Sequence, residues 1–270
     1  MRLRKKTVLK IGVIIFAVVV IAIIAIHICE GVGTRHSTQF VEIAYYSDKL
    51  PPELDGYKIA FVTDLHDYDD PRLIKIKDEI KLWQPDLLLL GGDFCADPRK
   101  HLAIFSLDPP DGTYGVGGNH DDPAVLFPLM REFGMRPLDN EGVLPHEGFY
   151  LAGVADLRTQ TPDTAKALQN APNDAFVLLL SHNPALVMEH DVSRADLVLA
   201  GHTHGGQWNL FGRWSPALSI INPYGNRFRT GWAQGPDGTD VYVSNGLGSK
   251  NNLLRIFAPR QVIFLTLHNR

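Results

Sequence analysis

Five short polar clusters rich in Asp, Asn and His stand out in this chain of 270 residues. Each cluster follows a run of apolar residues and contains at least one side chain that can bind a metal ion. The five clusters are Thr63-Asp64-Leu65-His66, Gly91-Gly92-Asp93, Gly118-Asn119-His120-Asp121, Ser181-His182-Asn183 and Gly201-His202-Thr203-His204. Carboxylate, amide and imidazole ligands without a thiolate suit Mn²⁺, Fe²⁺ or Zn²⁺ better than Ca²⁺ or a lone Mg²⁺.

The number of candidate ligands favours two ions over one. Two ions about 3.5–4 Å apart need a bridging carboxylate, and such a pair suits phosphoester hydrolysis because it holds both the attacking and the leaving oxygen. Asp64 and Asp93 could instead cap helices that follow their strands, since Asp is a common N-cap residue. His182 taken alone is weak evidence. The five clusters together favour a dinuclear metal centre.

The apolar runs before the clusters predict the strands that position them. The runs are KIAFVTD, DLLLLGGD, TYGVGGN, FYLAGVAD, AFVLLLSH and DLVLAGH, with DVYVSNG and QVIFLTL after them, and an earlier edge strand is expected around Phe40–Tyr45. Between the first two runs, apolar side chains recur at helical spacing from Leu73 to Trp83, and Pro71 stands where a helix would start. The early strands therefore predict βαβ units, and the late strands, which lack helices between them, look antiparallel. Because ligands gather at the carboxyl ends of strands in open α/β sheets, five strands would direct their clusters to one place.

In this order, the blocks D-x-H, G-D, G-N-H-D, a histidine after a strand and G-H-x-H resemble the calcineurin-like metallophosphoesterases. GHTHGGQ, YVSNGLG and the Arg-x-x-x-Pro at Arg255–Pro259 are similar to a membrane-associated bacterial branch of that family. The resemblance spans about Lys58 to Leu267. It implies an α/β (α+β) fold, a four-layer α/β/β/α sandwich behind an N-terminal transmembrane helix, and a metal-dependent phosphoric ester hydrolase.

The resemblance also implies a role for each residue of the clusters. The implied metal ligands form two sets that share one bridging carboxylate: Asp64, His66 and His204; Asn119, His182 and His202; and Asp93 between the two sets. A hydroxide held by the two ions would attack phosphorus. His120 is implied to donate a proton to the leaving oxygen or to stabilise the phosphate, with Asp121 orienting its ring. Asp67, Asp69 and Asp70 stand where many relatives have a glycine, which leaves substrate contacts of that loop open.

Residues 7–28 form an apolar run of about 20 positions, long enough to cross a hydrocarbon core roughly 30 Å thick. The run is too long for the apolar part of a cleavable signal peptide, and no A-x-A follows it. The N-terminal side of this run carries five basic residues, Arg2, Arg4, Lys5, Lys6 and Lys10. The first stretch beyond the run carries Arg35 alone. The positive-inside rule then predicts a single-pass protein of the bacterial inner membrane with its catalytic domain outside the cytoplasm.

These observations divide the chain into three parts. Residues 1–30 are expected to form a basic cytoplasmic tip and a membrane anchor, residues 31–56 a stalk and edge segment, and residues 57–270 the phosphoesterase domain. The formal net charge is −4, but beyond the five N-terminal basic residues 21 Lys and Arg stand against 30 Asp and Glu. This acidic domain is unsuited to a nucleic-acid backbone. Cys29 and Cys95 cannot form a Cys-based zinc site, and a structural role is expected for Cys95.

A concentration of bulky apolar residues follows the last cluster. These residues are Trp208, Leu210, Phe211, Trp214, Leu218, Ile220 and Ile221. We expect packing over the sheet to account for most of this segment. The alternative is that part of the segment faces the bilayer or an acyl chain, since aromatic side chains favour the membrane interface. No role is assigned to the histidines outside the clusters, which are His27, His36, His101, His146, His190 and His268.

The sequence therefore predicts an enzyme that uses two divalent ions, Mn²⁺, Zn²⁺ or Fe²⁺, on a phosphodiester or phosphomonoester, with a lipid-linked or cell-envelope substrate. One alternative is a pyrophosphatase acting on UDP-2,3-diacylglucosamine in lipid A synthesis, but that substrate is cytoplasmic and the charge bias places the domain on the other side. A second alternative is a metal-binding envelope scaffold without turnover. Loss of Asn119, His120 or the bridging Asp93 would have indicated a scaffold, and all three are present.

Overall fold

The computed structural model describes residues 2–34, 38–66, 68, 70–94, 97–249 and 255–270. Asp67, Asp69 and Cys95 lie outside the described residues, as do Arg35 and His36. Within the described residues, twelve strands form two six-stranded sheets, each containing parallel and antiparallel pairs. The first sheet has the order β1-β12-β2-β3-β4-β5, and the second has the order β10-β11-β9-β8-β7-β6.

The bounds of the strands follow the apolar runs of the sequence. In the first sheet they are β1 Thr38–Ser47, β12 Arg260–Asn269, β2 Tyr57–Val62, β3 Leu87–Leu90, β4 Thr113–Gly115 and β5 Arg136–Pro137. In the second sheet they are β10 Gly231–Gln234, β11 Asp240–Val243, β9 Leu197–Ala200, β8 Phe176–Leu180, β7 Phe149–Gly153 and β6 Glu141–His146. Most of the central strands are buried on both faces, which explains their unbroken apolar character.

The helices differ greatly in length. The α-helices are α1 Arg2–Thr34, α2 Asp70–Trp83, α3 Leu102–Phe105, α4 Pro123–Glu132, α5 Thr164–Leu168, α6 Leu186–Glu189 and α7 Pro216–Ile221. Three short 3₁₀ helices are η1 Pro52–Leu54, η2 Pro98–His101 and η3 His204–Gly206. The helix predicted between the first two strands is confirmed as α2, with Pro71 at its second residue.

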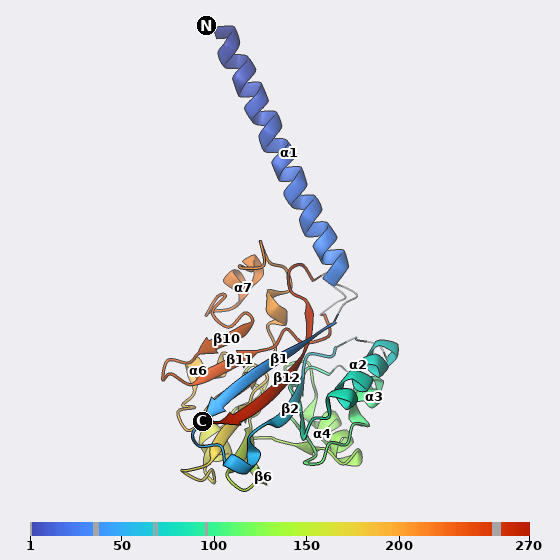
Figure 1. Ribbon diagram of the computed structural model, residues 1–270, viewed down its shortest axis with the longest axis vertical. Coiled ribbons are helices and arrows are strands. Elements are labelled where there is room, and N and C mark those ends of the chain that lie inside the picture. Colours follow the sequence, from blue (N-terminus) through green and yellow to red (C-terminus); the bar gives the residue numbers. More distant parts are fainter. Residues whose placement is uncertain (1, 35–37, 67, 69, 95–96, 250–254) are drawn as a thin grey trace.

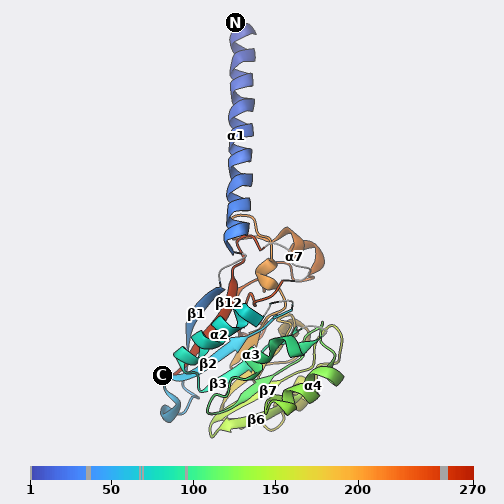
Figure 2. The same cartoon turned by 90° about the vertical axis from the view of Figure 1, so that its right-hand side faces the viewer.

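The two sheets pack face to face around a central core, and helices cover their outer faces. Alternation along β2 shows the layers, because Ile59 and Phe61 lie in the core between the sheets whereas Ala60 and Val62 face the helices. α2, α3 and α4 pack on the first sheet, and α5 and α6 pack on the second. The four-layer α/β/β/α arrangement is confirmed (Figures 1 and 2).

The late strands are less regular than the sequence indicated. β9 runs parallel to both β8 and β11, so the expectation of antiparallel late strands is wrong there. The chain from Gly201 to Thr239 lies between β9 and β11, which is long enough for the crossover that a parallel pair requires. β10 with β11 and β12 with β2 do pair antiparallel. The predicted edge strand is confirmed as β1, which pairs with β12 over all ten of its residues although it lies before residue 57.

α1 projects away from the sandwich (Figure 1). Its apolar part, Thr7–Cys29, has 23 residues and is long and apolar enough to cross a membrane. At 1.5 Å per residue such a segment is about 34 Å long, close to the roughly 30 Å of a hydrocarbon core. Nearly all of its side chains are exposed, as expected of a helix that is apolar all round and has no protein partner along most of its length.

Candidate metal centre

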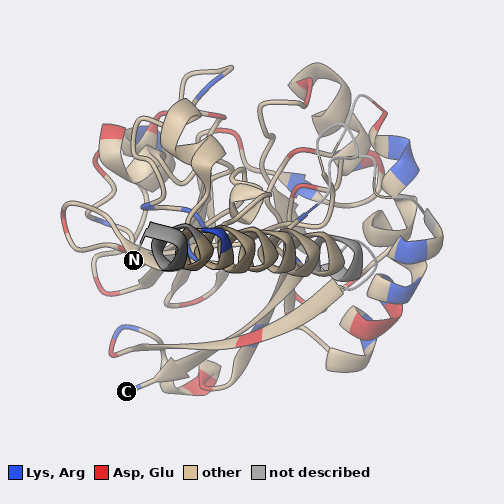
Figure 3. Ribbon diagram, turned by 90° about the horizontal axis from the view of Figure 1, so that it is seen from above, with Lys and Arg blue, Asp and Glu red and all other residues tan. Residues whose placement is uncertain are grey.

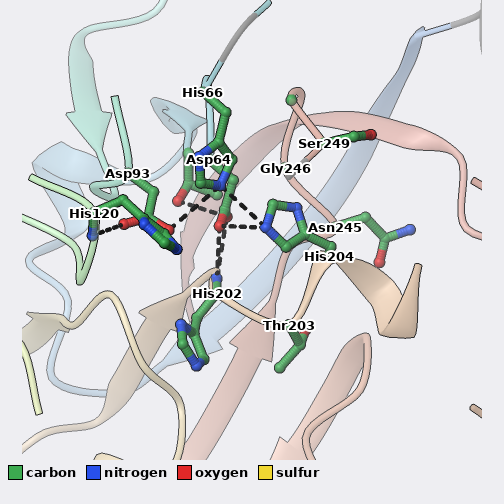
Figure 4. A network of polar contacts seen from close by, with 12 residues as sticks. Asp64, His66, Asp93, His120, His202, Thr203, His204, Asn245, Gly246 and Ser249 are labelled. Atoms are coloured by element: carbon green, nitrogen blue, oxygen red, sulfur yellow. Dashed lines mark hydrogen bonds and ion pairs between the residues drawn. The ribbon is translucent and has the colours of Figure 1, made fainter. Parts of the chain in front are cut away.

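The carboxyl ends of five strands meet at one place, and each carries one of the predicted clusters. Asp64 follows β2, Asp93 follows β3 and Asn119 follows β4 in the first sheet. His182 follows β8, and the pair His202 and His204 follows β9 in the second sheet. Figure 4 shows several of these side chains pointing toward one another from both sheets. The predicted convergence of the clusters is therefore found in the structure.

A first group of possible metal ligands consists of Asp64, His66, Asp93 and His204, whose ligand atoms all lie within 4.8 Å of one another. The Nε2 atoms of His66 and His204 are 3.1 Å apart. Nε2 of His66 is 3.4 Å from Oδ2 of Asp93, and Nε2 of His204 is 3.6 Å from Oδ1 of Asp64 (Figure 4). Two imidazole nitrogens and two carboxylates at these distances match the donor set of a divalent transition metal.

A second group consists of Asp93, His182 and His202, again with all ligand atoms within 4.8 Å. Nε2 of His182 lies 3.3 Å from Oδ2 of Asp93 and 3.2 Å from Nδ1 of His202. Oδ2 of Asp93 therefore faces both groups. Oδ1 of Asn119 is buried and has no hydrogen-bond partner among the described residues. An amide oxygen in that state fits a metal ligand, because burying it unpaired is otherwise costly.

The backbone at these positions is unusual. Five candidate ligands have positive φ angles between 43° and 68°: Asp64, His66, Asp93, His202 and His204. Residues with side chains rarely adopt such angles, and strained backbone of this kind clusters at functional sites. A glycine allows the loop after β4 to lie against Asp93, because a Cβ on Gly118 would overlap the carboxylate of Asp93. The strained turns place ligand side chains directly after their strands.

Hydrogen bonds orient several of the candidate ligands. Nδ1 of His182 is 2.8 Å from the carbonyl oxygen of Gly91, which can only accept, so Nδ1 carries the proton and Nε2 is left facing Asp93. Asp64 accepts the amide N–H of His202 and, at 2.9 Å, the hydroxyl of Thr63. Such outer contacts fix the orientation of metal ligands in proteins.

Burial and mutual charge perturb the ionisation of these groups strongly. Burial raises the pKa of Asp64 to about 7 and lowers that of His202 to about 3. Burial opposes the charge of His182, but Asp93 beside it outweighs this and raises the pKa of His182 to about 10. A bound cation would remove the reason for Asp64 to hold a proton, since it replaces the proton as the compensating charge. The donor set therefore fits divalent metal ions.

Asp121 binds the backbone of two loops beside the candidate ligands. Its carboxylate accepts three backbone N–H groups, from Asp93 at 2.7 Å, Phe94 at 2.8 Å and Gly118 at 2.8 Å. Among the described residues it makes no hydrogen bond to the ring of His120. The expectation that Asp121 orients the ring of His120 stays a prediction, since the contacts found are to the backbone of the two loops. Asp121 joins the loop after β3 to the loop after β4.

Arg255, which the sequence offered only as part of a motif, is fully enclosed next to the first group. Its Nη2 atom donates to the carbonyl oxygens of Asn245, at 2.8 Å, and Gly248. The same atom lies 3.1 Å from Nδ1 of His204. A buried guanidinium with several acceptors holds its surroundings rigidly, since each donor fixes a direction. Arg255 thus connects the loop after β11 to the loop that carries His204.

Comparison with known proteins decides the family. Residues 57–206 match the family model described as calcineurin-like phosphoesterase. The chain belongs to this family. The resemblance derived from the five clusters is thereby confirmed, and the match covers the strands that carry every candidate ligand.

Several relatives of this phosphoesterase cover most of its length. It is 30% identical over 250 residues to the metallophosphoesterase YkuE of Bacillus subtilis (strain 168), covering 86% of each chain. It is 32% identical over 254 residues to phosphodiesterase YaeI of Escherichia coli (strain K12), covering 83% of this chain and 86% of YaeI. A transmembrane protein with metallophosphoesterase domain from Danio rerio is 26% identical, covering 94% of this chain and 62% of that protein. The chain spans 64% of a metallophosphoesterase from Campylobacter jejuni, Cj0846.

Family membership and the clustered Asp and His side chains together support a metal-dependent phosphoric ester hydrolase. The phosphoesterase has a pocket of about 300 Å³ beside the metal centre. His120 lines this pocket, and its ring centroid is 5.4 Å from that of His66. The backbone N–H of His120 donates to Oδ1 of Asp93 at 2.8 Å. The structure therefore places an imidazole in the pocket beside the candidate metal ligands.

Arg158 is a residue of this pocket that the sequence did not reveal. It lies in the turn after β7, where Asp156 accepts its backbone N–H, and its side chain reaches the pocket that His120 and His202 line. No cluster or motif marks the turn, so no local signal pointed to Arg158. A guanidinium facing a pocket of this family suits a phosphate oxygen, which it can bind through two donors.

Replacement of Arg158 by Gln should raise KM for a phosphodiester by about tenfold and change kcat less, because one charge-assisted hydrogen bond is worth about 1.5–3 kcal/mol. Steady-state kinetics with bis-p-nitrophenyl phosphate measures both constants. Arg131→Gln, at the surface of α4, serves as the matched control and should behave as wild type. An unchanged KM in the Arg158 variant would show that this side chain does not bind the phosphate.

Proposed function

We propose that the chain hydrolyses phosphodiester or phosphomonoester bonds with the help of two divalent metal ions. The proposed ligands are Asp64, His66 and His204 for one ion, Asn119, His182 and His202 for the other, and Asp93 for both. The observation that carries this proposal is Oδ2 of Asp93, which lies 3.4 Å from His66 Nε2 and 3.3 Å from His182 Nε2. When bound, such ions supply Lewis-acid charge and a water of lowered pKa as the nucleophile.

Two further residues that line the pocket, Arg158 and His120, would complete the reaction, with support from Asp121. Arg158 would bind a non-bridging phosphate oxygen and fix the orientation of the phosphorus. His120 would hold a proton on its imidazole and transfer it to the oxygen of the leaving group. Asp121 would keep His120 and Asp93 in place through the backbone contacts it makes on both loops. No covalent enzyme intermediate is needed for this sequence of events.

We further propose that α1 crosses the bacterial inner membrane once, with the basic N-terminal residues in the cytoplasm and the sandwich outside it. The support is the charge difference across the apolar run and the Danio rerio relative, which is named as a transmembrane protein. The substrate would then be a lipid-linked or cell-envelope phosphoester. We expect activity from a reporter enzyme that works only outside the cytoplasm when it is fused after Arg270. An inactive fusion that is present at normal levels would contradict this orientation.

The catalytic proposal is tested on the full chain purified in detergent and loaded with Mn²⁺. We expect about two metal ions per chain by elemental analysis, and hydrolysis of bis-p-nitrophenyl phosphate or p-nitrophenyl phosphate. His204→Gln should lose both metal and activity, whereas His146→Gln, which removes an imidazole bonded to Asp111, should retain both. Two bound ions without turnover of either substrate would favour a metal-binding scaffold instead.

A further inference from the structure

The end of α1 contacts the catalytic domain through a histidine to which the sequence assigned no role. The ring of His27 packs edge-on against Phe211 at 5.5 Å and Phe257 at 5.1 Å between ring centroids. His27 is only 7% exposed, in contrast to the apolar residues around it on α1. The contact joins the last turns of the apolar helix to two loops that are far away in the sequence.

This contact sets the depth of both loops relative to a membrane. His27 lies two positions before Cys29, the last residue of the apolar part Thr7–Cys29 of α1. Two residues correspond to about 3 Å along the helix axis. A side chain that touches His27 from the domain must therefore lie close to the boundary between hydrocarbon and headgroups. Phe211 and Phe257 are in that position if α1 spans a bilayer.

The segment around Phe211 exposes large apolar side chains on the same side of the domain. We call the exposed residues Trp208, Phe211, Trp214, Ile220 and Ile221 the apolar face. Phe211 is 64% exposed and Ile220 84% exposed. In Figures 1 and 2, α7, which carries the two isoleucines, lies at the end of the domain that the foot of α1 approaches. Such a concentration on a soluble surface marks an interaction site.

The charge of this region complements an anionic surface. From Leu197 to Pro236 the sequence contains no Asp or Glu, although the rest of the domain is acidic. The same stretch contains three arginines, and Arg213 is exposed between Phe211 and Trp214. Aromatic side chains with a flanking arginine are the composition of membrane-interface surfaces, where the cation meets lipid phosphates. Figure 3 looks onto this end of the domain from above, with α1 projecting toward the viewer.

The pocket of the metal centre borders the apolar face. Its lining includes polar residues, such as Asn119 and His202, and the apolar residues Leu218 and Ile221. Ile221 belongs to both the pocket wall and the apolar face. A substrate whose phosphate reaches the polar wall would thus place its neighbouring atoms against apolar side chains that continue toward the membrane.

We propose that the apolar face docks on the surface of the bilayer that α1 crosses, among anionic headgroups, so that the pocket opens toward lipid. The substrate class that fits this arrangement is a phosphoester whose apolar part stays in the membrane while its phosphate enters the pocket. The docking rests on the proposed membrane insertion of α1, and the substrate class rests on the proposed phosphoesterase function. His27 acts as the contact that holds the domain in this orientation.

Docking is tested without reference to catalysis. The full chain is reconstituted in vesicles of phosphatidylcholine and phosphatidylglycerol with brominated acyl chains, which quench tryptophan fluorescence on contact. Quenching should be seen in the wild type and should be largely lost when Trp208 and Trp214 are both replaced by Phe. The control Trp232→Phe, whose parent side chain packs against Tyr45 and Tyr242, should leave quenching intact. Equal quenching in the double variant and the wild type would overturn the proposal.

The orientation of the pocket is tested by turnover in the same kind of vesicle without bromine. A Phe211→Ser, Trp214→Ser variant should hydrolyse the p-nitrophenyl ester of phosphatidic acid at least about tenfold more slowly, because interfacial binding scales with buried apolar area. Its activity on soluble bis-p-nitrophenyl phosphate should stay unchanged. The control pair Leu82→Ser, Leu144→Ser removes exposed apolar side chains from α2 and β6 and should affect neither substrate.

The two measurements separate the two proposals. Equal losses on the lipid and the soluble substrate would show that Phe211 and Trp214 serve packing, which overturns the docking proposal. Quenching of Trp208 and Trp214 without turnover of any phosphoester would support docking and contradict the catalytic function. Turnover of the soluble substrate without quenching would contradict docking alone.

Discussion

Replacement of Asp93 by Asn should leave the chain with fewer than two bound metal ions and lower kcat/KM for bis-p-nitrophenyl phosphate by at least about 10³-fold. Loss of a residue that only hydrogen-bonds to a metal ligand already lowers metal affinity or activity about 10–100-fold. Asp93 itself belongs to both groups of candidate ligands. The amide keeps the shape of the side chain but lacks the charge that two cations would share. Elemental analysis and steady-state kinetics on the same preparation measure both effects.

The control for this prediction is another partly enclosed carboxylate. Asp111 is bonded to Tyr57 at 2.6 Å and to His146 at 2.9 Å, outside the metal centre. Asp111→Asn should keep both metal ions and its activity. Circular dichroism of both variants shows whether they are folded, since Asp93→Asn also removes the charge that faces His182. Two tightly held ions in folded Asp93→Asn would rule out Asp93 as the shared ligand.

Replacement of His120 by Ala should lower kcat by about 10²–10⁴-fold for an alkyl phosphodiester, because the leaving alkoxide needs a proton and we propose His120 as its donor. The loss should be much smaller for a p-nitrophenyl ester, whose leaving group departs without protonation. Metal content should be unchanged, since His120 faces the pocket and contacts Asp93 only through its backbone N–H. Comparing the two leaving groups in wild type and variant measures the effect.

Added imidazole provides an independent check on His120. Free imidazole should restore part of the alkyl-ester activity of His120→Ala by entering the space of the missing ring. His101→Ala is an unsuitable control because His101 is buried and bonded to Phe94, so His190→Ala, at a half-buried position that does not line the pocket, is used instead. Equal losses for the alkyl and the aryl ester would mean that His120 stabilises charge on the phosphate and does not deliver a proton.

Much of the fold could be predicted because local patterns reflect burial. Unbroken apolar runs indicated the central strands, and the spacing from Leu73 to Trp83 indicated α2. The parallel pairing of β9 with β8 and β11 could not be predicted in this way. Pairing depends on how the long connection after β9 crosses the sheet, and that connection contains only short elements with weak periodicity.

The candidate ligands could be named from the sequence because their chemistry lies in the side chains themselves, whereas their supports could not. Asp121 looked like a partner of His120 because it is adjacent in sequence, but its oxygens bind the backbone of two loops. Arg158 had no motif around it, although it faces the same pocket. Neighbours in the chain are not the neighbours in the site, since the loops that build it turn at positive φ angles.

The sequence by itself determined the kinds of ligand, their order along the chain, the apolar run of α1 and the family to which these clusters point. Only the tertiary structure decided that Oδ2 of Asp93 faces both groups of ligands and that His27 touches Phe211. Composition and periodicity indicate which residues of a local stretch of chain are buried. Contacts between residues far apart in the chain depend on how two sheets pack and how their loops turn, which no local stretch contains.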